Sequence, residues 1–236
     1  MSIYVIGDLH LSFKESKPMN IFGENWTNHE EKIKNNWMKE IKYDDLVILP
    51  GDFSWAMHLE DTELDFKYLN QLPGNKILLK GNHDYWWNTL TKMDNFLKKI
   101  EVNNISFINS NAIEYKNAII VGTKGYNFSE QENDQKLRNR EYIRLALSIK
   151  YAKEKFNVEN KEIICALHYP PITNNMVKAN QTNEFIEILK ENNIHRCVYA
   201  HLHGLSCNNA FNGIYKDIEF NLTSSDFLNF VPLKLL

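Results

Sequence analysis

Short apolar runs in this chain end repeatedly in side chains that carry a carboxylate, an amide or an imidazole. They are Ile3–Ile6 before Asp8 and His10, Leu46–Leu49 before Asp52, Ile77–Leu79 before Asn82, Ile163–Leu167 before His168, and Cys197–Ala200 before His201 and His203. In an α/β sheet, sites are built in the loops beyond the carboxyl ends of the strands. Packing does not require a strand to end in Asp, Asn or His every time. The pattern therefore predicts an α/β fold whose strand ends gather one metal site.

The length of the chain and its cysteines limit the kind of domain it can form. At 236 residues, the sequence predicts a single domain over residues 1–236, with a sizeable core. Its three cysteines are an odd number without Cys-x-x-Cys spacing, which indicates neither a disulfide framework nor a thiolate zinc site. Cys165 and Cys197 lie inside apolar runs, and we expect them to fill the core.

The chain shows no sequence signal for a membrane. None of its apolar runs approaches the ~20 residues that cross a bilayer. The amino terminus enters a predicted strand at once, which leaves no room for a charged and apolar signal segment. We therefore expect a cytoplasmic protein.

Helical and strand patterns alternate in the first half of the sequence, and the second half is richer in strands. Helices are predicted after a capping box at Thr27–Glu30, over Leu64–Leu69, after Trp87, and from a second candidate cap at Ser129–Glu132 through Phe156. Further strands are predicted at Ile105–Ile108 and Ala118–Val121, and Gly213–Leu222 alternates like one antiparallel strand. With no repeat or linker in the sequence, a single mixed α/β domain is predicted.

The predicted ligands are carboxylates, an amide oxygen and imidazoles, without a thiolate. This donor set suits manganese, iron, zinc or cobalt, whereas magnesium or calcium would seldom use four histidines. Seven ligands exceed the needs of one ion, but a pair ~3.5–4 Å apart could use them all by sharing a carboxylate. Two cations flanking one water lower its pKa, supply a hydroxide nucleophile and bind phosphate oxygens. His83, next to Asn82, could protonate a leaving alkoxide.

Five blocks of the sequence together resemble the signature of the calcineurin-like metallophosphoesterases. They are Asp8-x-His10, Gly51-Asp52, Gly81-Asn82-His83-Asp84, His168 and His201-x-His203, and they follow the order of the family over most of the chain. The resemblance implies a four-layer α/β/β/α sandwich and two divalent metal ions, with manganese or iron favoured. Position by position, it implies that Asp8, His10, Asp52 and His203 hold the first metal, and that Asn82, His168, His201 and the bridging Asp52 hold the second. It also implies that His83 is the acid on the leaving-group side.

The chain departs from the family pattern after the second block. Family protein phosphatases carry an Asp-Arg pair there, which orients the acid and grips phosphate, whereas this chain has Phe53–Ala56. The absence disfavours protein phosphatase activity and favours phosphodiesters slightly over phosphomonoesters. Asp84 is a candidate partner of His83, but it could equally anchor the ligand loop. Ala200 stands where many family members have Gly, and we expect it to keep a negative φ.

Several other side chains have both a functional and a structural interpretation. Trp55, Trp86 and Trp87 follow ligand loops and could form a stacking rim, although core packing is favoured. Arg138, Arg140 and Arg144 form a basic stripe, which is more typical of a solvated helix face than of a phosphate clamp. His58 could line the cleft, whereas His29 and His195 are predicted at the surface.

Two functions of different classes fit these residues. The first is a dinuclear-metal phosphoesterase acting on a small phosphate ester, with His83 as general acid. The alternative is a non-catalytic interaction scaffold that keeps the fold and the metals. An enzyme is favoured, because a scaffold has no need of an acid beside Asn82. The net charge of −3 and the lack of a basic track predict no polymeric nucleic acid partner.

Overall fold

The computed structural model describes residues 2–15, 17–128 and 132–236, and its strands form two mixed sheets. The first sheet has the order β11 (Leu233–Lys234), β1 (Ile3–Val5), β2 (Leu46–Leu49), β3 (Asn75–Leu79) and β4 (Ile105–Ile108). The second has the order β5 (Ile113–Tyr115), β6 (Ala118–Thr123), β7 (Glu162–Leu167), β8 (Arg196–Tyr199), β10 (Ile218–Leu222) and β9 (Gly213–Tyr215). Neighbouring strands run parallel in the middle of each sheet, and β11, β5 and β9 are antiparallel strands at the edges.

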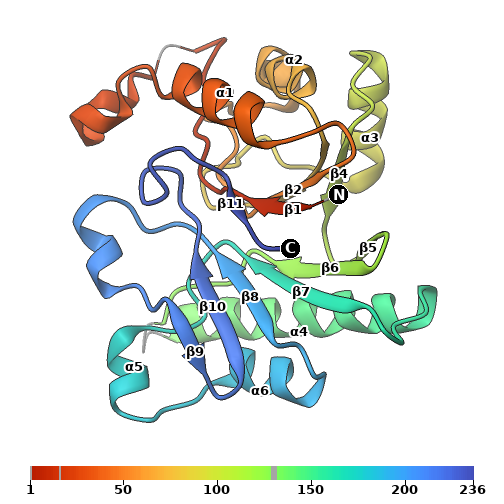
Figure 1. The fold of residues 1–236 in the computed structure, drawn as a ribbon, viewed down its shortest axis with the longest axis vertical. Coiled ribbons are helices and arrows are strands. Elements are labelled where there is room, and N and C mark those ends of the chain that lie inside the picture. The colour runs from red at the N-terminus through yellow and green to blue at the C-terminus, as the bar shows by residue number, and fades with distance from the viewer. Residues whose placement is uncertain (1, 16, 129–131) are drawn as a thin grey trace.

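Helices cover the outer face of each sheet, so that the two sheets face one another (Figure 1). The first sheet carries α1 (His29–Glu40), α2 (Glu63–Gln71) and α3 (Leu90–Lys99), and the second carries α4 (Glu132–Lys155) and α6 (Glu184–Glu191). A short helix, α5 (Asn174–Lys178), precedes α6. The predicted four-layer α/β/β/α sandwich is therefore confirmed.

Three apolar clusters fill the three spaces between the four layers. Alternation along β1 illustrates the division: Ile3 and Val5 point into the space between the sheets, whereas Tyr4 contributes to the cluster under α1–α3. The third cluster lies between the second sheet and its helices and includes Cys165 and Cys197, which are buried and unpaired as predicted. Because both faces of each central strand are buried, their sequences read as continuous apolar runs.

The parallel arrangement brings the ends of the central strands to one edge of the molecule. In the first sheet, β1, β2 and β3 end there, and in the second sheet β6, β7, β8 and β10 end there. Isolated bridges tie the loops beyond these ends together, joining Gly7 to Ser224 and Leu11 to Ser54. The loops that carry the predicted ligands are thus held by backbone hydrogen bonds rather than left free.

Most predicted elements are confirmed, with corrections near α1 and β10. Helix α1 begins at His29 and is preceded by Asn28 in a left-handed conformation without a side-chain cap, so the predicted capping box is wrong. His29 is not at the surface: it is 3% exposed and packs against Trp26 and Phe230. The stretch Gly213–Leu222 is a hairpin of β9 and β10, because Lys216 and Asp217 both adopt positive φ and reverse the chain. The second candidate cap, at Ser129–Glu132, falls largely outside the described residues.

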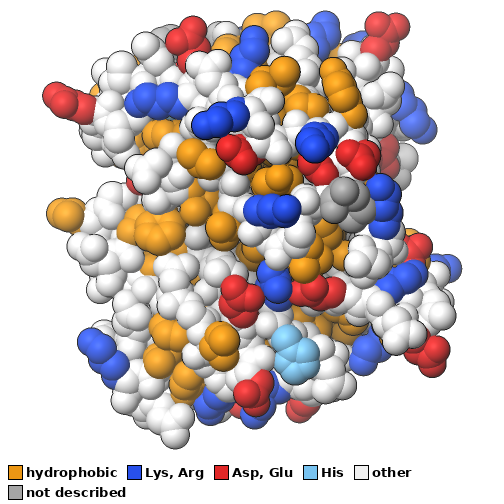
Figure 2. Space-filling view, in the orientation of Figure 1, with side chains coloured by type: hydrophobic (Ala, Val, Ile, Leu, Met, Phe, Trp, Pro, Cys, Tyr) orange, Lys and Arg blue, Asp and Glu red, His pale blue; other side chains and the backbone are white. Residues whose placement is uncertain are grey.

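On the face drawn in Figure 2, acidic and basic side chains are interspersed rather than sorted into patches of one sign. In the part of the chain that the structure describes, no helix combines the length and the apolar character needed to cross a bilayer.

Candidate metal centre

The loops after β1, β2 and β8 place their polar residues by unusual backbone conformations. Asp8, His10, Asp52 and His201 have positive φ values of 57°, 47°, 51° and 76°. This left-handed region costs a non-glycine residue of order 1 kcal/mol or more, and such costs persist mainly at functional sites. Ala200 is absent from the positive-φ residues of the described chain, as predicted, and the left-handed turn falls one residue later at His201.

Two glycines allow the loops after β2 and β3 to approach one another. Gly51 has φ +92°, and a Cβ on it would lie 2.6 Å from Nδ1 of His168. A Cβ on Gly81 would collide with the backbone nitrogen and Oδ1 of Asp52. The Gly-Asp and Gly-Asn-His-Asp blocks of the sequence therefore need glycine because their backbones pack directly against the predicted ligands.

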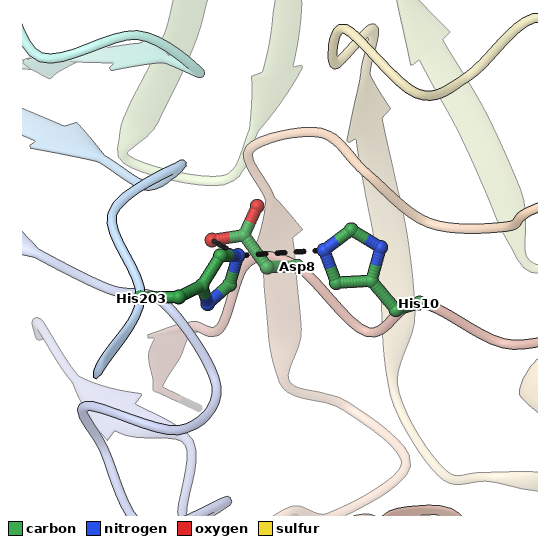
Figure 3. Close-up of side chains that lie close together, drawn as sticks. All are labelled: Asp8, His10 and His203. Carbon is green, nitrogen blue, oxygen red and sulfur yellow. Dashed lines mark hydrogen bonds and ion pairs between the residues drawn. The ribbon is translucent and has the colours of Figure 1, made fainter. Parts of the chain in front are cut away.

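Asp8, His10 and His203 form a first donor group, whose ligand atoms all lie within 4.8 Å of one another. Figure 3 shows the two imidazoles facing each other, with Nε2 of His10 3.4 Å from Nε2 of His203. Oδ2 of Asp8 lies 3.7 Å from the same nitrogen of His203. On its other side, Nδ1 of His203 is 2.8 Å from Oδ1 of Asp226, which orients the ring.

Asp52, His168 and His201 form a second group of the same kind. Nδ1 of His168 is 3.0 Å from the carbonyl oxygen of Pro50, and since a carbonyl only accepts, this nitrogen carries the proton. The lone pair of Nε2 then faces Oδ1 of Asn82 at 2.6 Å and Oδ2 of Asp52 at 3.5 Å. Nε2 of His168, Oδ1 of Asn82 and Oδ2 of Asp52 are thus acceptor atoms that face one another, and His168 Nε2 carries no hydrogen to share with the two oxygens.

Asp52 lies between the two groups. Its Oδ2 is 3.9 Å from Nε2 of His10 in the first group and 3.5 Å from Nε2 of His168 in the second. Its Oδ1 accepts a hydrogen bond of 2.8 Å from the backbone N–H of His83, which fixes the carboxylate. This is the position that a bridging ligand of a metal pair requires.

The electrostatics of the two groups suit divalent cations. Burial lowers the pKa of His10 well below its ordinary value and lowers the pKa of His168 and His201 to about 3. These rings are therefore uncharged at pH 7 and can offer a nitrogen lone pair to a metal ion. Burial raises the pKa of Asp8 to about 7, and its Oδ1 is buried without a hydrogen-bond partner. Burying acceptors without donors is costly, and cations would relieve that cost.

His203 behaves differently from the other three histidines. Burial opposes its protonation, but the nearby carboxylates of Asp8 and Asp226 outweigh burial and raise the pKa of His203 to about 9. A proton and a metal ion therefore compete for Nε2 of this ring, which faces His10 and Asp8. Taken together, the seven predicted ligands lie in one cluster, in which Asp8, His10, Asp52 and His168 are buried and the other three are partly buried, and their free atoms could hold two metal ions.

His83 lies beside the first group without joining it. Its ring centroid is 5.8 Å from that of His10 and 4.5 Å from the ring of Trp55. Asp84 is fully buried and accepts hydrogen bonds from the backbone of Asp52, Phe53, Ser54 and Gly81 and from Nε1 of Trp86. These bonds tie the loop after β3 to the loop after β2, which favours the anchoring interpretation of Asp84 over a partnership with His83.

The remaining residues singled out in the sequence divide between core, surface and site. Trp86 is buried in the first cluster, and Trp87 is half-buried against it. Trp55 instead stacks on His10 with ring centroids 4.8 Å apart. His58 and His195 are exposed, and His58 lines a separate surface pocket with Tyr85 and Lys92.

The three arginines of α4 have different surroundings. Arg140 is exposed. Arg138 donates to the carbonyl oxygen of Asn127, and Arg144 donates to the buried carboxylate of Glu141 over 2.6 Å. Glu141 also accepts a hydrogen bond from the hydroxyl of Thr123 at the end of β6. Arg144 is thus already engaged beside the strand that leads to the site.

Three residues near the centre were not singled out from the sequence. Asp226 follows β10 and orients His203. Lys124 follows β6, and Tyr169 follows His168 directly. The ammonium of Lys124 lies 5.6 Å from the ring centre of Tyr169, whose own ring is 4.2 Å from that of His201. The polar run Thr223–Asp226 after an apolar strand was the available sequence signal for Asp226, and the seven predicted ligands were singled out by the same kind of signal.

Comparison with known proteins agrees with this geometry. A family model described as calcineurin-like phosphoesterase matches residues 1–205. A protein of unknown function from Aquifex aeolicus is similar in structure, with a TM-score of 0.51 and 19% identity over 99% of this chain and 95% of that one. A phosphopantetheinyl hydrolase from Mycobacterium tuberculosis has a TM-score of 0.57 and 12% identity, covering 100% of this chain and 95% of that one. At identities this low, the structural likeness shows the fold alone. No similar sequence was found among curated proteins.

Proposed function

The chain belongs to the calcineurin-like phosphoesterase family, and we propose that it hydrolyses small phosphate esters at a centre of two divalent metal ions. The observation that carries this proposal is the place of Asp52, which belongs to the second donor group and whose Oδ2 also lies 3.9 Å from Nε2 of His10 in the first group. Family membership makes phosphoester chemistry the expected use of such a centre. The paired donor groups make two ions the expected number.

The seven predicted ligands divide between the two ions. Asp8, His10 and His203 would hold the first, His168, His201 and Asn82 would hold the second, and Asp52 would serve both. Manganese, iron, zinc and cobalt suit this set, and manganese or iron is favoured. Such a pair would lower the pKa of a water molecule and neutralise charge on the phosphate oxygens.

His83 supplies the proton in the proposed reaction. Hydrolysis replaces the bond from phosphorus to the departing oxygen by a bond to a water oxygen, and the departing oxygen takes up a proton. The imidazole of His83 stands beside the first donor group, and its backbone N–H holds Asp52. It can therefore give a proton without being a ligand. Asp84, with its carboxylate engaged by five donors, supports this loop as an anchor.

The negative charge of the substrate would face the side of the centre opposite His83. Lys124 and Tyr169 lie beside the second donor group, and Lys124 is among the groups whose charge opposes the effect of burial on the pKa of Asp52. An ammonium is a point charge and cannot bind two phosphate oxygens side by side as a guanidinium does. Lys124 would therefore bind a dianionic monoester less tightly than the Arg that family protein phosphatases carry after the second block. We therefore propose that small phosphodiesters are turned over at least as well as matched monoesters.

A screen of the purified protein loaded with Mn²⁺ tests this function. The substrates are an aryl phosphomonoester, an aryl phosphodiester and cyclic nucleotides, with an Asp52→Asn variant as control. We expect metal-dependent turnover, with the aryl diester at least as good as the monoester. A protein that binds two Mn²⁺ ions and hydrolyses none of these esters would instead support the non-catalytic scaffold.

A further inference from the structure

An apolar cavity of about 80 Å³ opens beside His83. Its walls are the side chains of Met19, Phe22, Trp26 and Trp55, together with the imidazole rings of two predicted metal ligands and of His83. A second cavity of about 290 Å³ lies next to it and shares Met19, Phe22 and Trp55 as walls. Its other walls are Pro18, Ile21 and Lys17, and the ammonium of Lys17 lies 4.7 Å from the ring centre of Trp55. A mainly apolar surface with one cation therefore continues outward from the metal centre.

The aromatic walls are held rigidly against the first donor group. Trp55 stacks on His10, and its Nε1 donates to Sδ of Met19 over 3.1 Å. Trp26 is 2% exposed and lies edge-on to His10 and His203, with ring centroids 5.9 and 5.5 Å away. Rings fixed in this way form a wall before any ligand arrives.

The outer part of this surface faces solvent. Phe22 is 60% exposed and Ile21 is 74% exposed, and both belong to the segment Met19–Phe22 before α1. Apolar side chains gathered at the mouth of a site cost hydration free energy and are typical of ligand-binding surfaces. A heavily hydroxylated group placed in the inner cavity would lose water on its apolar walls and find polar partners only in the three imidazoles, two of which belong to predicted metal ligands.

The position of His83 identifies the part of a substrate that would occupy this surface. In the proposed function, on which this inference rests, His83 gives its proton to the departing oxygen. Whatever is attached to that oxygen must then extend from His83 along Trp55 and Phe22. We infer that the two cavities form a leaving-group pocket, and that the substrates are phosphate esters of apolar alcohols or phenols rather than of sugars or other polyols.

A series of n-alkyl phosphates from ethyl to hexyl tests the pocket, because the alcohols have similar acidity and differ only in apolar length. With the Mn²⁺-loaded protein, kcat/KM is expected to rise about two- to four-fold per added methylene until the pocket is filled. The matching n-alkylphosphonates, which cannot be hydrolysed at the P–C bond, should show the same trend in affinity by calorimetry.

Variants at Phe22 test whether this apolar surface causes the dependence of kcat/KM on chain length. Phe22→Ser should flatten the dependence on chain length, so that the ratio of hexyl to ethyl kcat/KM falls about 10-fold or more. Phe22→Leu, which keeps an apolar wall, should retain most of the dependence. Tyr43→Ser is the matched control: Tyr43 is also an exposed aromatic residue (86%), and it precedes β2 at the end of the strand away from the site.

The possible outcomes distinguish a failure of the leaving-group pocket from a failure of the proposed function. Esters that are hydrolysed equally well at every chain length would overturn the pocket and leave the proposed function intact. A dependence on length that survives unchanged in Phe22→Ser would also overturn it. If no ester is hydrolysed but phosphonate affinity rises with length and falls in Phe22→Ser, the proposed function is wrong and the leaving-group role falls with it, which leaves only an apolar surface that binds alkyl chains.

Discussion

The two donor groups have similar ligands but opposite surroundings. The group of Asp8, His10 and His203 is bordered by Trp26 and Trp55, and the His83 imidazole stands near it. The group of Asp52, His168 and His201 is bordered by Tyr169, over which the ammonium of Lys124 lies. One side of the centre is thus lined by aromatic rings and the imidazole of His83, and the other side is lined by Tyr169 and the ammonium of Lys124.

This difference would orient a phosphate ester at the centre. A phosphate ester has a charged phosphoryl part and, in the substrates inferred above, an apolar leaving group. The charged part matches the side of Lys124, and the apolar part matches the side of Trp55 and His83. Ligand identity alone would not orient a substrate, since both groups offer carboxylate and imidazole donors. The surrounding residues do so, and changing them one side at a time should separate the two functions.

The largest effect is expected at the residue that the two groups share. Asp52→Asn removes the negative charge that offsets repulsion between two cations, so both metal ions should be weakened and hydrolysis should fall to background. Asn82→Ala is the comparison, and it should weaken mainly the ion of the second group. Metal content after gel filtration, measured for both variants, distinguishes them. Loss of only one ion in Asp52→Asn would contradict a bridging role.

The next largest effect is expected at His83. Replacing it by Asn should leave the metal content almost unchanged, while turnover of an alkyl ester falls ~10²–10⁴-fold, as for a positioned general acid. A nitrophenyl ester, whose leaving group hardly needs a proton, should lose noticeably less. Equal losses on both esters would show that His83 binds the phosphate instead, and loss of metal would make it a ligand.

A smaller effect, confined to the charged side, is expected at Lys124. Lys124→Met removes a charged partner of the phosphoryl oxygens, which is worth roughly 1.5–3 kcal/mol, or about 10- to 100-fold in kcat/KM for a monoester. A singly charged diester should lose less, and Lys124→Arg should retain most activity. The ratio of monoester to diester kcat/KM is the measurement. An unchanged ratio would remove Lys124 from the account of substrate binding.

An effect on metal affinity, confined to the first donor group, is expected from Asp226, on the other side. Asp226→Asn weakens the hydrogen bond that orients His203, and removal of such a partner costs ~10–100-fold in metal affinity. Competition with a chelator should show one weakened ion and one unchanged ion. Two equally weakened ions would mean that the two groups are coupled more tightly than their separate surroundings indicate.

The apolar runs of the sequence predicted the central strands, and the polar residues after them, for one physical reason, whereas the four layers were implied by the family resemblance. Strands buried on both faces stand out as apolar runs, and the polar residues that follow them, such as Asp8 and His201, stand out against those runs. The features that the sequence did not predict depend on pairing between strands that are distant in the chain. Gly213–Leu222 was predicted as a single antiparallel strand, but β10 runs parallel to β8, so that its carboxyl end delivers Asp226 to the site. Alternation along one strand does not reveal the direction of its neighbour.

Side chains that act through packing were equally hidden. His29 was predicted at the surface from local capping residues, yet contacts with Trp26 and Phe230, the latter 201 positions further along the chain, bury it. Lys124 follows a strand like the ligands do, but a lone lysine after a strand is ordinarily a solvated side chain. Only the folded chain brings its ammonium over Tyr169.

The central claim is that Asp52 joins two separate metal sites in one chain. Its most direct test is elemental analysis of protein that has been stripped with a chelator, reloaded with Mn²⁺ and freed of excess metal. The account predicts a ratio close to two ions per chain, since each of the two buried donor groups takes one. A ratio that stays at one under saturating Mn²⁺, with the wild-type protein folded, would contradict it.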